Sequence, residues 1–327
     1  MTNVMPHASG FKASYVWPNA AFPFRVYHSS KKCRVFIIEN IQHNWNWLLE
    51  WHDKIRDTDF FFVYCGWYHS PAFAREAHKI FELLKLQKSN FFIMFNSPEE
   101  MENFRPFEFQ GDVINHNAWL DEAVTMRPLS GIEKKFDAIY VGRRSAFKRH
   151  MLAEKVARLA LVAGINHGNN ISPVPDNPAF INDTPLSPEH VCHTINQSHC
   201  GLILSAIEGA CFASSEYLLC GVPVVSTPSQ GGRDVWYNGY NSIVCDPDPE
   251  AVAEAVDFFC RHRPDPRAIR AMHIEQAKAY RTRFIMELQS VFDRFGEKDT
   301  DATKYFERNF KHKLRASYKP DFAEIFG

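Results

Sequence analysis

The sequence predicts an α/β protein built from two doubly wound domains. In both halves of the chain, short β-branched and aromatic runs alternate with longer segments whose apolar residues have helical spacing, which is typical of parallel sheets with βαβ crossovers. The length of 327 residues is about twice that of a typical domain. A polar segment at residues 126–135, with Pro128, Gly131 and two adjacent lysines, separates the halves. We therefore place the domain boundary between residues 128 and 129.

In the first half, each short apolar run predicts a buried strand and each longer periodic segment predicts a helix. We expect strands at residues 34–38, 60–65, 91–95 and 112–114, and helices at 44–55, 71–86 and 98–104. These elements would form an N-terminal domain over residues 1–128.

The second half repeats the alternation up to residue 261. We expect strands at residues 136–141, 201–204, 222–226 and 242–244, and helices at 147–163, 188–197, 213–220 and 249–261. Five prolines between residues 166 and 188 exclude a continuous helix there, so we expect a long, functional loop with room for one short strand. Further helices are expected up to residue 295, before an acidic break at 297–301.

Composition excludes several classes of protein. Lys and Arg total 37 against 38 Asp and Glu, so no overall positive charge would attract nucleic acid. The longest strongly apolar run, at residues 60–64, is far short of the about 18 residues that span a bilayer, and no signal-peptide pattern is present. The eight cysteines lack a disulfide framework, which indicates reduced thiols. We expect a soluble, cytoplasmic protein.

One group of side chains resembles a metal site by composition alone. It consists of His190, Cys192, His193, His199 and Cys200. Their spacing fits no standard zinc pattern, so a helix followed by a strand is the preferred interpretation, and no metal is expected.

Residues 202–226 carry the clearest signs of a ligand site. Glu208 lies on the turn after a buried strand, where ligands bind in open α/β sheets, and Gly209 allows close backbone approach. The N–H groups of Ala210, Cys211 and Phe212 can then face an anion. Glu216 follows eight residues after Glu208, about 12 Å along a helix, too far for a glycosidase carboxylate pair. The two carboxylates should therefore have separate roles.

Several ordered motifs resemble the retaining GT-B glycosyltransferases of family 4. The segment YVGRRSAFKRH matches the family's Gly-Arg-x4-Lys, and EGACFASSE matches its Glu-x7-Glu. The segment CGVPVVSTPSQGGRDVWYNGYNSIVCDPDPEAVAEAV follows at the usual distance, and INHNAWLDE resembles the end of the N-terminal domain. The resemblance covers residues 97–260 and is strongest from residue 136.

The resemblance implies two Rossmann-like domains with an interdomain cleft, and a nucleotide-sugar site in the C-terminal domain at residues 129–285. Helices in residues 286–327 would cross back to the N-terminal, acceptor-side domain. Arg143 and Lys148 would bind the donor diphosphate, Glu208 the sugar, and Glu216 the ribose. The implied reaction is retaining transfer of a hexose-like unit from a nucleoside diphosphate sugar to a hydroxyl group, without metal or other cofactor. Saccharide or lipid-linked acceptors in polysaccharide or glycoconjugate biosynthesis would be the partners.

The N-terminal half departs from the family pattern. The usual glycine-rich loop after the first strand is missing, because residues 39–44 contain no glycine, so the acceptor site is undefined. His69, directly after the expected strand at 60–65, is our first candidate for a catalytic or acceptor-binding role, ahead of His116. The alternative is that His69 packs at the edge of the sheet beside its aromatic neighbours.

Each assigned residue also has a structural interpretation. Arg143 and Lys148 could be solvated cations, Glu208 could accept hydrogen bonds within a turn, and Glu216 could pair with a cation. Gly231 and Gly232 could either make a simple turn or leave N–H groups free for a phosphate or sugar, and Arg233 and Asp234 stay unassigned. A nucleotide-sugar epimerase, a phosphorylase-like enzyme and a non-catalytic nucleotide-sugar-binding module are the rival functions.

The charge of the chain is unevenly distributed. Residues 261–327 hold 15 Lys/Arg and 10 Asp/Glu, and residues 1–260 hold 22 and 28. Six of these cations lie in residues 304–319. This tail could contact the anionic inner face of a membrane peripherally, or it could form a solvated bracing helix.

Overall fold

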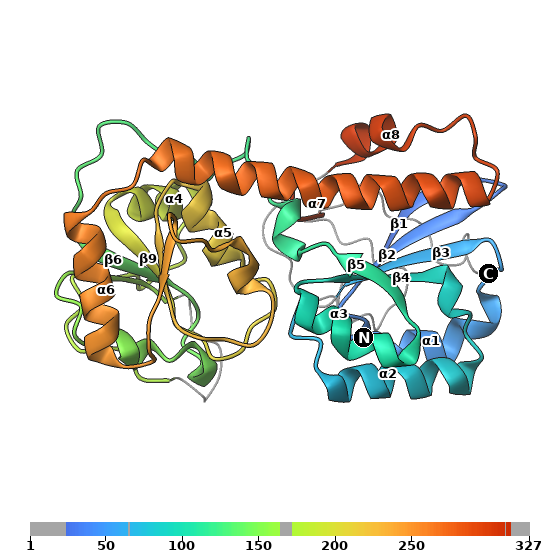
Figure 1. Cartoon of the computed structure of the whole chain (residues 1–327), viewed down its shortest axis with the longest axis horizontal. Coiled ribbons are helices and arrows are strands. Elements are labelled where there is room, and N and C mark those ends of the chain that lie inside the picture. The colour runs from blue at the N-terminus through green and yellow to red at the C-terminus, as the bar shows by residue number, and fades with distance from the viewer. Residues whose placement is uncertain (1–23, 65, 164–171, 311, 315–327) are drawn as a thin grey trace. The chain divides into compact units, whose positions relative to one another are not determined.

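The computed structural model describes residues 24–64, 66–163, 172–310 and 312–314, which form two compact units (Figure 1). Unit 1 comprises residues 1–119 and 278–327, and unit 2 comprises residues 120–277. The boundaries expected from the sequence, after residues 128 and 285, lie nine and eight residues further along the chain than those of the two units. Each unit has its own largely parallel sheet, and the predicted class of two Rossmann-like α/β domains is confirmed.

The sheet of unit 1 has five strands in sequential order. They are β1 (Phe24–Ser29), β2 (Arg34–Glu39), β3 (Asp59–Tyr64), β4 (Phe91–Phe95) and β5 (Gln110–Val113). The helices between them are α1 (Trp45–Trp51), α2 (Pro71–Leu84) and α3 (Pro98–Phe104). α2 and α3 each begin at a proline that follows a capping serine, Ser70 or Ser97, whose hydroxyl accepts a backbone N–H. β1 pairs antiparallel with β2, and the sequence analysis missed it.

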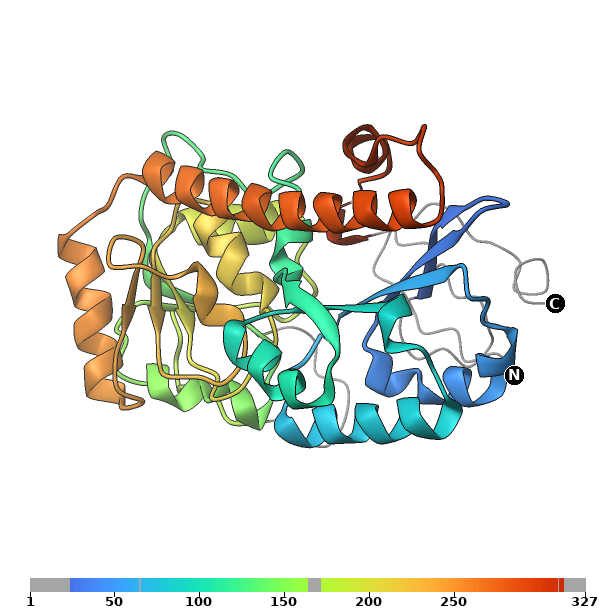
Figure 2. The same cartoon turned by 45° about the vertical axis from the view of Figure 1, so that its right-hand side comes forward.

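Unit 1 buries both faces of this sheet. On one face, Phe61 stacks between Phe36 and Phe91 in the core beneath α1 and α2. On the other face, Phe62 contacts Phe284 of α7 (Pro266–Arg294), with ring centroids 4.7 Å apart. Figure 2 shows α7 and α2 on opposite sides of the sheet. The second helical layer of unit 1 therefore comes from the C-terminal segment, which also carries α8 (Ala302–Asn309).

The six parallel strands of unit 2 have the order β11-β10-β9-β6-β7-β8. Their bounds are β6 (Phe136–Val141), β7 (Leu159–Val162), β8 (Phe180–Ile181), β9 (Ser198–Ile203), β10 (Val224–Ser226) and β11 (Ser242–Val244). The order reverses between β6 and β9, which makes this sheet doubly wound and places a topological switch point there.

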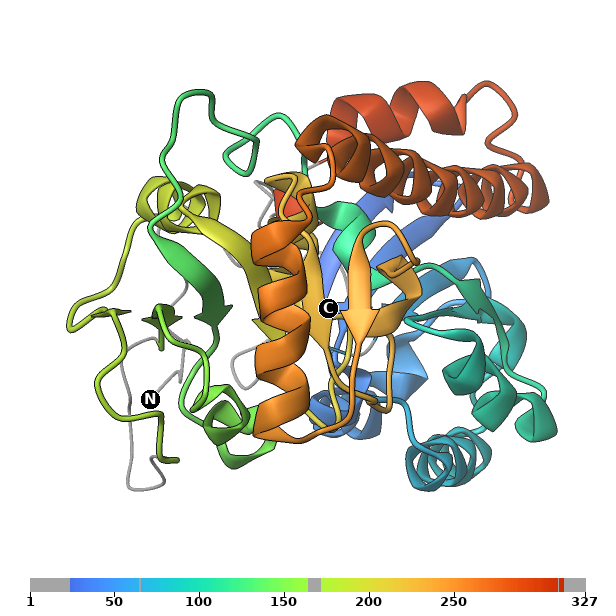
Figure 3. The same ribbon diagram turned by 60° about the vertical axis from the view of Figure 1, so that its left-hand side comes forward.

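Helices cover both faces of the unit 2 sheet. They are α4 (Pro188–Asn196), α5 (Phe212–Leu219) and α6 (Pro249–Arg261). Leu202 of β9 belongs to the core under α6, which lies across one face of the sheet (Figure 3), whereas its neighbour Gly201 faces Tyr217 of α5. A Cβ at Gly201 would lie 2.2 Å from the Tyr217 ring, so only glycine lets α5 pack this closely.

The helix expected at residues 147–163 is wrong. Two 3-10 turns, Ala146–Lys148 and His150–Ala153, occupy its first half, and β7 occupies its end. Arg149 between the turns has φ 52°, a left-handed conformation that interrupts a helix. The apolar run that forms β7 is short, and such runs fit a buried strand as well as a helix.

Other differences are smaller. α1 ends at Trp51, four residues before the expected end, and is followed by a 3-10 turn at His52–Lys54. The short strand allowed for in the proline-rich loop is β8, although residues 164–171 lie outside the described residues. The basic tail begins in α8, and its residues 311 and 315–319 also lie outside them. Among the residues that the structure describes, no helix is both long enough and apolar enough to span a membrane.

Further 3-10 turns complete the connections. They are Ile41–His43, Lys88–Asn90, Arg105–Phe107, His116–Trp119, Arg233–Trp236 and His312–Leu314.

Candidate functional site

The carboxyl ends of β6 and β9 bring together two motifs that are distant in sequence. Lys148 follows β6, and Glu208 lies on the turn after β9. The Lys148 Nζ donates a hydrogen bond to Glu208 Oε1 over 2.6 Å, and both residues are only 8% exposed. The side chains expected at the diphosphate and at the sugar thus lie in direct contact at the switch point of the sheet.

Two buried groups hold the other oxygen of Glu208. The Ser205 hydroxyl donates to Glu208 Oε2 over 2.6 Å. Arg233, with no exposed surface, donates to Ser205 Oγ at 3.3 Å and to the Ile203 carbonyl oxygen at 2.6 Å. The carboxylate therefore has a fixed orientation, and Arg233, unassigned from the sequence, positions it through Ser205.

Lys148 is a protonated amine in a buried position. Burial acts to lower the pKa of Lys148, but the neighbouring Cys211 and Glu208 raise it above its ordinary value. The Arg143 guanidinium and the Lys148 ammonium both lie over the ring of Phe147, 5.6 and 5.4 Å from its centroid. Arg143 is exposed, so its charge is available to a ligand.

The amino end of α5 begins beside this pair. Phe212 is the first residue of the helix, and Cys211 precedes it with φ 54°. A helix amino terminus carries partial positive charge, and its first turn here contains no acidic residue. Glu216 lies one turn further along and is half-buried. Lys148, Arg143 and this helix end together form a positive site next to the Glu208 carboxylate, which suits an anion joined to a hydroxyl-bearing group.

The Gly231–Gly232 segment packs against the Glu208 turn. A Cβ on Gly231, whose φ is +106°, would lie 1.6 Å from the Glu208 carbonyl oxygen. The Glu208 N–H donates to the Gln230 carbonyl at 3.0 Å, and the Gly232 N–H donates to the Gly209 carbonyl at 3.1 Å. The Gly232 N–H is therefore engaged by the chain itself, and the expectation that it is free for a phosphate finds no support.

Arg149 is a further cation that the sequence analysis did not select. Its Nε donates to the Leu204 carbonyl at 2.6 Å, and its Nη2 donates to Thr227 Oγ1 at 2.7 Å. It thus ties the ends of β9 and β10 together. The signal in the sequence was its position next to Lys148, although spacing alone does not separate a scaffolding cation from a ligand-binding one.

His69 lies in the core of unit 1. It is fully buried, its Nδ1 is 3.0 Å from Glu100 Oε2, and Phe73, Phe95 and Phe104 surround its ring. The ring has no surface for a substrate in this structure, and the edge-packing interpretation fits its surroundings. His116 is also buried, and burial with the nearby Arg25 and Lys313 lowers its pKa to about 3.

The sulfur atoms of the group at residues 190–200 have separate partners. Cys192 Sγ lies 3.8 Å from Cys220 Sγ, whereas Cys200 Sγ donates to the Asp137 carbonyl at 3.5 Å. The two thiols therefore do not point to one shared position.

The match of unit 2 to a known family covers part of this site. Residues 177–278 match the family model described as "Glycosyl transferases group 1". The match includes Glu208, Glu216 and the two glycines, but Arg143 and Lys148 lie before it. A comparison with curated proteins finds no match.

Solved glycosyltransferase structures share the fold. A sucrose-phosphate synthase from Thermosynechococcus elongatus is 15% identical, with a TM-score of 0.56, and the alignment covers 80% of this chain and 74% of that one. An α,α-trehalose-phosphate synthase from Burkholderia xenovorans, in complex with glucose-6-phosphate, is 10% identical, with a TM-score of 0.56 and coverage of 80% and 75%. A trehalose 6-phosphate synthase from Burkholderia multivorans is 12% identical, with a TM-score of 0.55 and coverage of 83% and 73%. At these identities the likeness establishes the GT-B type of fold alone.

Proposed function

We propose that the protein is a retaining glycosyltransferase that moves a hexose-like unit from a nucleoside diphosphate sugar to a hydroxyl acceptor without a metal ion. The observation that carries the proposal is the contact between Lys148 and Glu208. It joins a cation outside the matched family segment to a carboxylate inside it. The diphosphate and the sugar are adjacent parts of one donor molecule, so the cation that binds the diphosphate and the carboxylate that binds the sugar must lie close together.

The cations serve the departure of the diphosphate. Cleavage of the bond from the anomeric carbon to oxygen builds negative charge on the distal phosphate. Arg143, Lys148 and the amino end of α5 would bind this charge in the proposal, and fixed groups of this kind stabilise a transition state without reorganisation. They would replace the divalent cation that other transferases use.

Glu208 and Glu216 have separate roles in the proposal. Glu208, held by Ser205, accepts hydrogen bonds from sugar hydroxyl groups and fixes the donor sugar. Glu216, further along α5, accepts from the ribose hydroxyls. The acceptor oxygen attacks the face from which the diphosphate leaves, and its proton passes to the departing phosphate oxygen, so that charge and atoms balance with retention.

A saccharide or a lipid-linked alcohol is proposed as the acceptor, within polysaccharide or glycoconjugate biosynthesis. The enzyme would act in the cytoplasm, with the basic C-terminal tail touching the inner face of the membrane. Cosedimentation with anionic vesicles at low salt, compared for the full chain and a chain ending near residue 301, tests that contact.

A panel of nucleoside diphosphates and their sugars, screened by thermal shift, identifies the donor. Glu216→Ala should weaken nucleoside diphosphate binding, whereas Glu208→Gln should mainly lower turnover, and the exposed Glu254→Gln of α6 is the matched control. Products formed with and without acceptor separate a transferase from an epimerase. If donors bind but neither transfer nor slow hydrolysis occurs, the chain is a binding module.

A further inference from the structure

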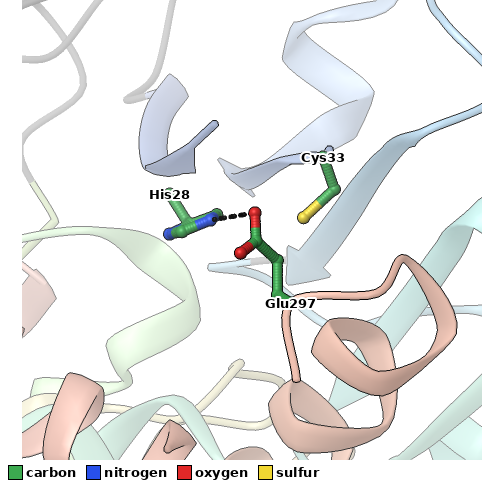
Figure 4. A group of neighbouring side chains, drawn as sticks. All are labelled: His28, Cys33 and Glu297. Atoms are coloured by element: carbon green, nitrogen blue, oxygen red, sulfur yellow. Dashed lines mark ion pairs between the residues drawn. The ribbon is translucent and has the colours of Figure 1, made fainter. Parts of the chain in front are cut away.

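Three side chains capable of binding a metal converge in unit 1, two from the β1–β2 hairpin and one from a segment more than 260 residues further along the chain. His28 is on β1, Cys33 lies just before β2, and Glu297 follows α7 (Figure 4). One ligand atom from each lies within 4.8 Å of the other two. No other group of three His, Cys, Asp or Glu in the described part of the chain is this compact.

The hydrogen-bonding capacity of this group of side chains is not fully satisfied by the residues that the structure describes. His28 Nε2 lies 3.5 Å from Glu297 Oε1, and this buried nitrogen has no hydrogen-bond partner among the described residues. A 3.5 Å separation is too long for a normal hydrogen bond between nitrogen and oxygen. Cys33 is 1% exposed. A buried imidazole nitrogen, a carboxylate oxygen and the sulfur of a buried cysteine therefore lie close together in unit 1.

Neighbouring residues hold Glu297 and His28 in place. The Ser30 hydroxyl donates to Glu297 Oε1, and Lys32 Nζ donates to the Gly296 carbonyl at 2.6 Å, which anchors the loop that carries Glu297. The His28 ring packs against the rings of Phe292 and Tyr305, with centroids 5.0 and 5.2 Å away. Both of these rings come from the C-terminal segment of unit 1. Second-sphere contacts of this kind orient the ligands of metal sites.

We propose that His28, Cys33 and Glu297 form a binding site for Zn²⁺. Nitrogen, sulfur and oxygen together are the ligand set that zinc prefers, whereas calcium and magnesium take oxygen. Bonds of about 2.0–2.3 Å in a tetrahedral site place neighbouring ligand atoms about 3.3–3.8 Å apart. The distance of 3.5 Å between His28 Nε2 and Glu297 Oε1 already lies in this range, and the Cys33 sulfur lies within 4.8 Å of both atoms. Cys33 binds as the thiolate, so its proton passes to solvent, and water occupies the fourth position.

Such a site would clamp the C-terminal segment onto the amino-terminal hairpin. The ligands join β1 and the β1–β2 turn to the residue run that follows α7. The proposed donor site belongs to unit 2, so this metal would be structural and would take no part in sugar transfer. Bound Zn²⁺ should then raise the melting temperature without changing turnover.

The test uses the full chain without an affinity tag, stripped of metal and titrated with Co²⁺ and Zn²⁺ alone. Wild type should take up one Co²⁺ per chain with a thiolate-to-cobalt charge-transfer band, and Zn²⁺ should displace it. Cys33→Ser should abolish the band and weaken affinity at least tenfold, while the control Cys245→Ser, a partly buried cysteine of unit 2, should retain both.

Glu297→Gln provides a second test that does not disturb a buried thiol. It should keep the charge-transfer band but weaken the affinity for Co²⁺ at least tenfold, and circular dichroism of each variant verifies the fold. A band that persists in Cys33→Ser, or the absence of stoichiometric binding to wild type, would overturn the proposal.

Discussion

Replacing Lys148 with Met removes one charge from the buried pair while keeping an unbranched side chain of similar length. Glu208, 8% exposed, would keep the Ser205 hydroxyl but lose the ammonium group 2.6 Å from its Oε1. Removing one partner of a buried ion pair costs about 3–5 kcal/mol, because the remaining charge is left uncompensated. For a unit of this size, 1 kcal/mol corresponds to about 2–4 °C, so the melting temperature should fall by about 6–20 °C.

The double variant Lys148→Met/Glu208→Gln separates stability from catalysis. Both buried charges are then absent, so the double variant should lose less stability than the two single variants lose together. The difference, which is the coupling energy of the pair, should be about 2 kcal/mol or more. Turnover should stay reduced by roughly 10²–10³, since the preorganised charge at the leaving group is still missing.

Scanning calorimetry and donor turnover, measured on the wild type, both single variants and the double variant, supply the two readouts. Glu254→Gln controls for the loss of a carboxylate elsewhere in unit 2. Strictly additive stability losses would refute the buried pair. Recovery of turnover together with stability would show that the pair only supports the fold.

Three further changes have defined outcomes. Arg143→Ala should lower turnover by roughly 10² with little change in melting temperature, because this exposed guanidinium contributes charge and no buried contact; an unchanged rate contradicts its place at the diphosphate. Gly231→Ala should destabilise unit 2 and abolish donor binding, because the added Cβ would meet the Glu208 carbonyl oxygen. The control Gly239→Ala adds a Cβ in open space, so it should leave the melting temperature unchanged. Burial lowers the pKa of His150 to about 4, so on acidification the unfolded chain takes up this proton before the folded protein does. The free energy of unfolding should therefore fall between about pH 6.5 and pH 4, by up to about 1.4 kcal/mol per pH unit. In His150→Gln, urea unfolding measured across that pH range should lack this pH dependence.

Much of the fold follows from local sequence patterns. The run at β3 is apolar at nearly every position because the strand is buried on both faces, and such runs are recognisable without tertiary information. β1 was missed because its residues, FRVYHS, mix apolar and polar side chains as an edge strand does. Residues 147–163 were misassigned because left-handed Arg149 looks like a good helix former in sequence.

In the candidate site, too, some features could be predicted from the sequence and others required the structure. Both motifs were recognisable from the sequence, because a buried carboxylate needs a partner and a carboxylate beside glycine after a buried strand therefore stands out. The contact between the two motifs was not predictable, since Lys148 and Glu208 are 60 residues apart in the sequence. The contact exists because β9 pairs directly with β6, an arrangement set by strand order and not by either segment.

Sequence by itself determined most of the buried strands and the charged motifs, since periodicity and composition report the local burial of each segment. Tertiary structure alone decided which of them touch. His28, Cys33 and Glu297 are the extreme case, because 264 residues separate Cys33 from Glu297, and only the return of the chain to unit 1 after α7 brings them together. Their proximity depends on long-range packing, which no local spacing rule records.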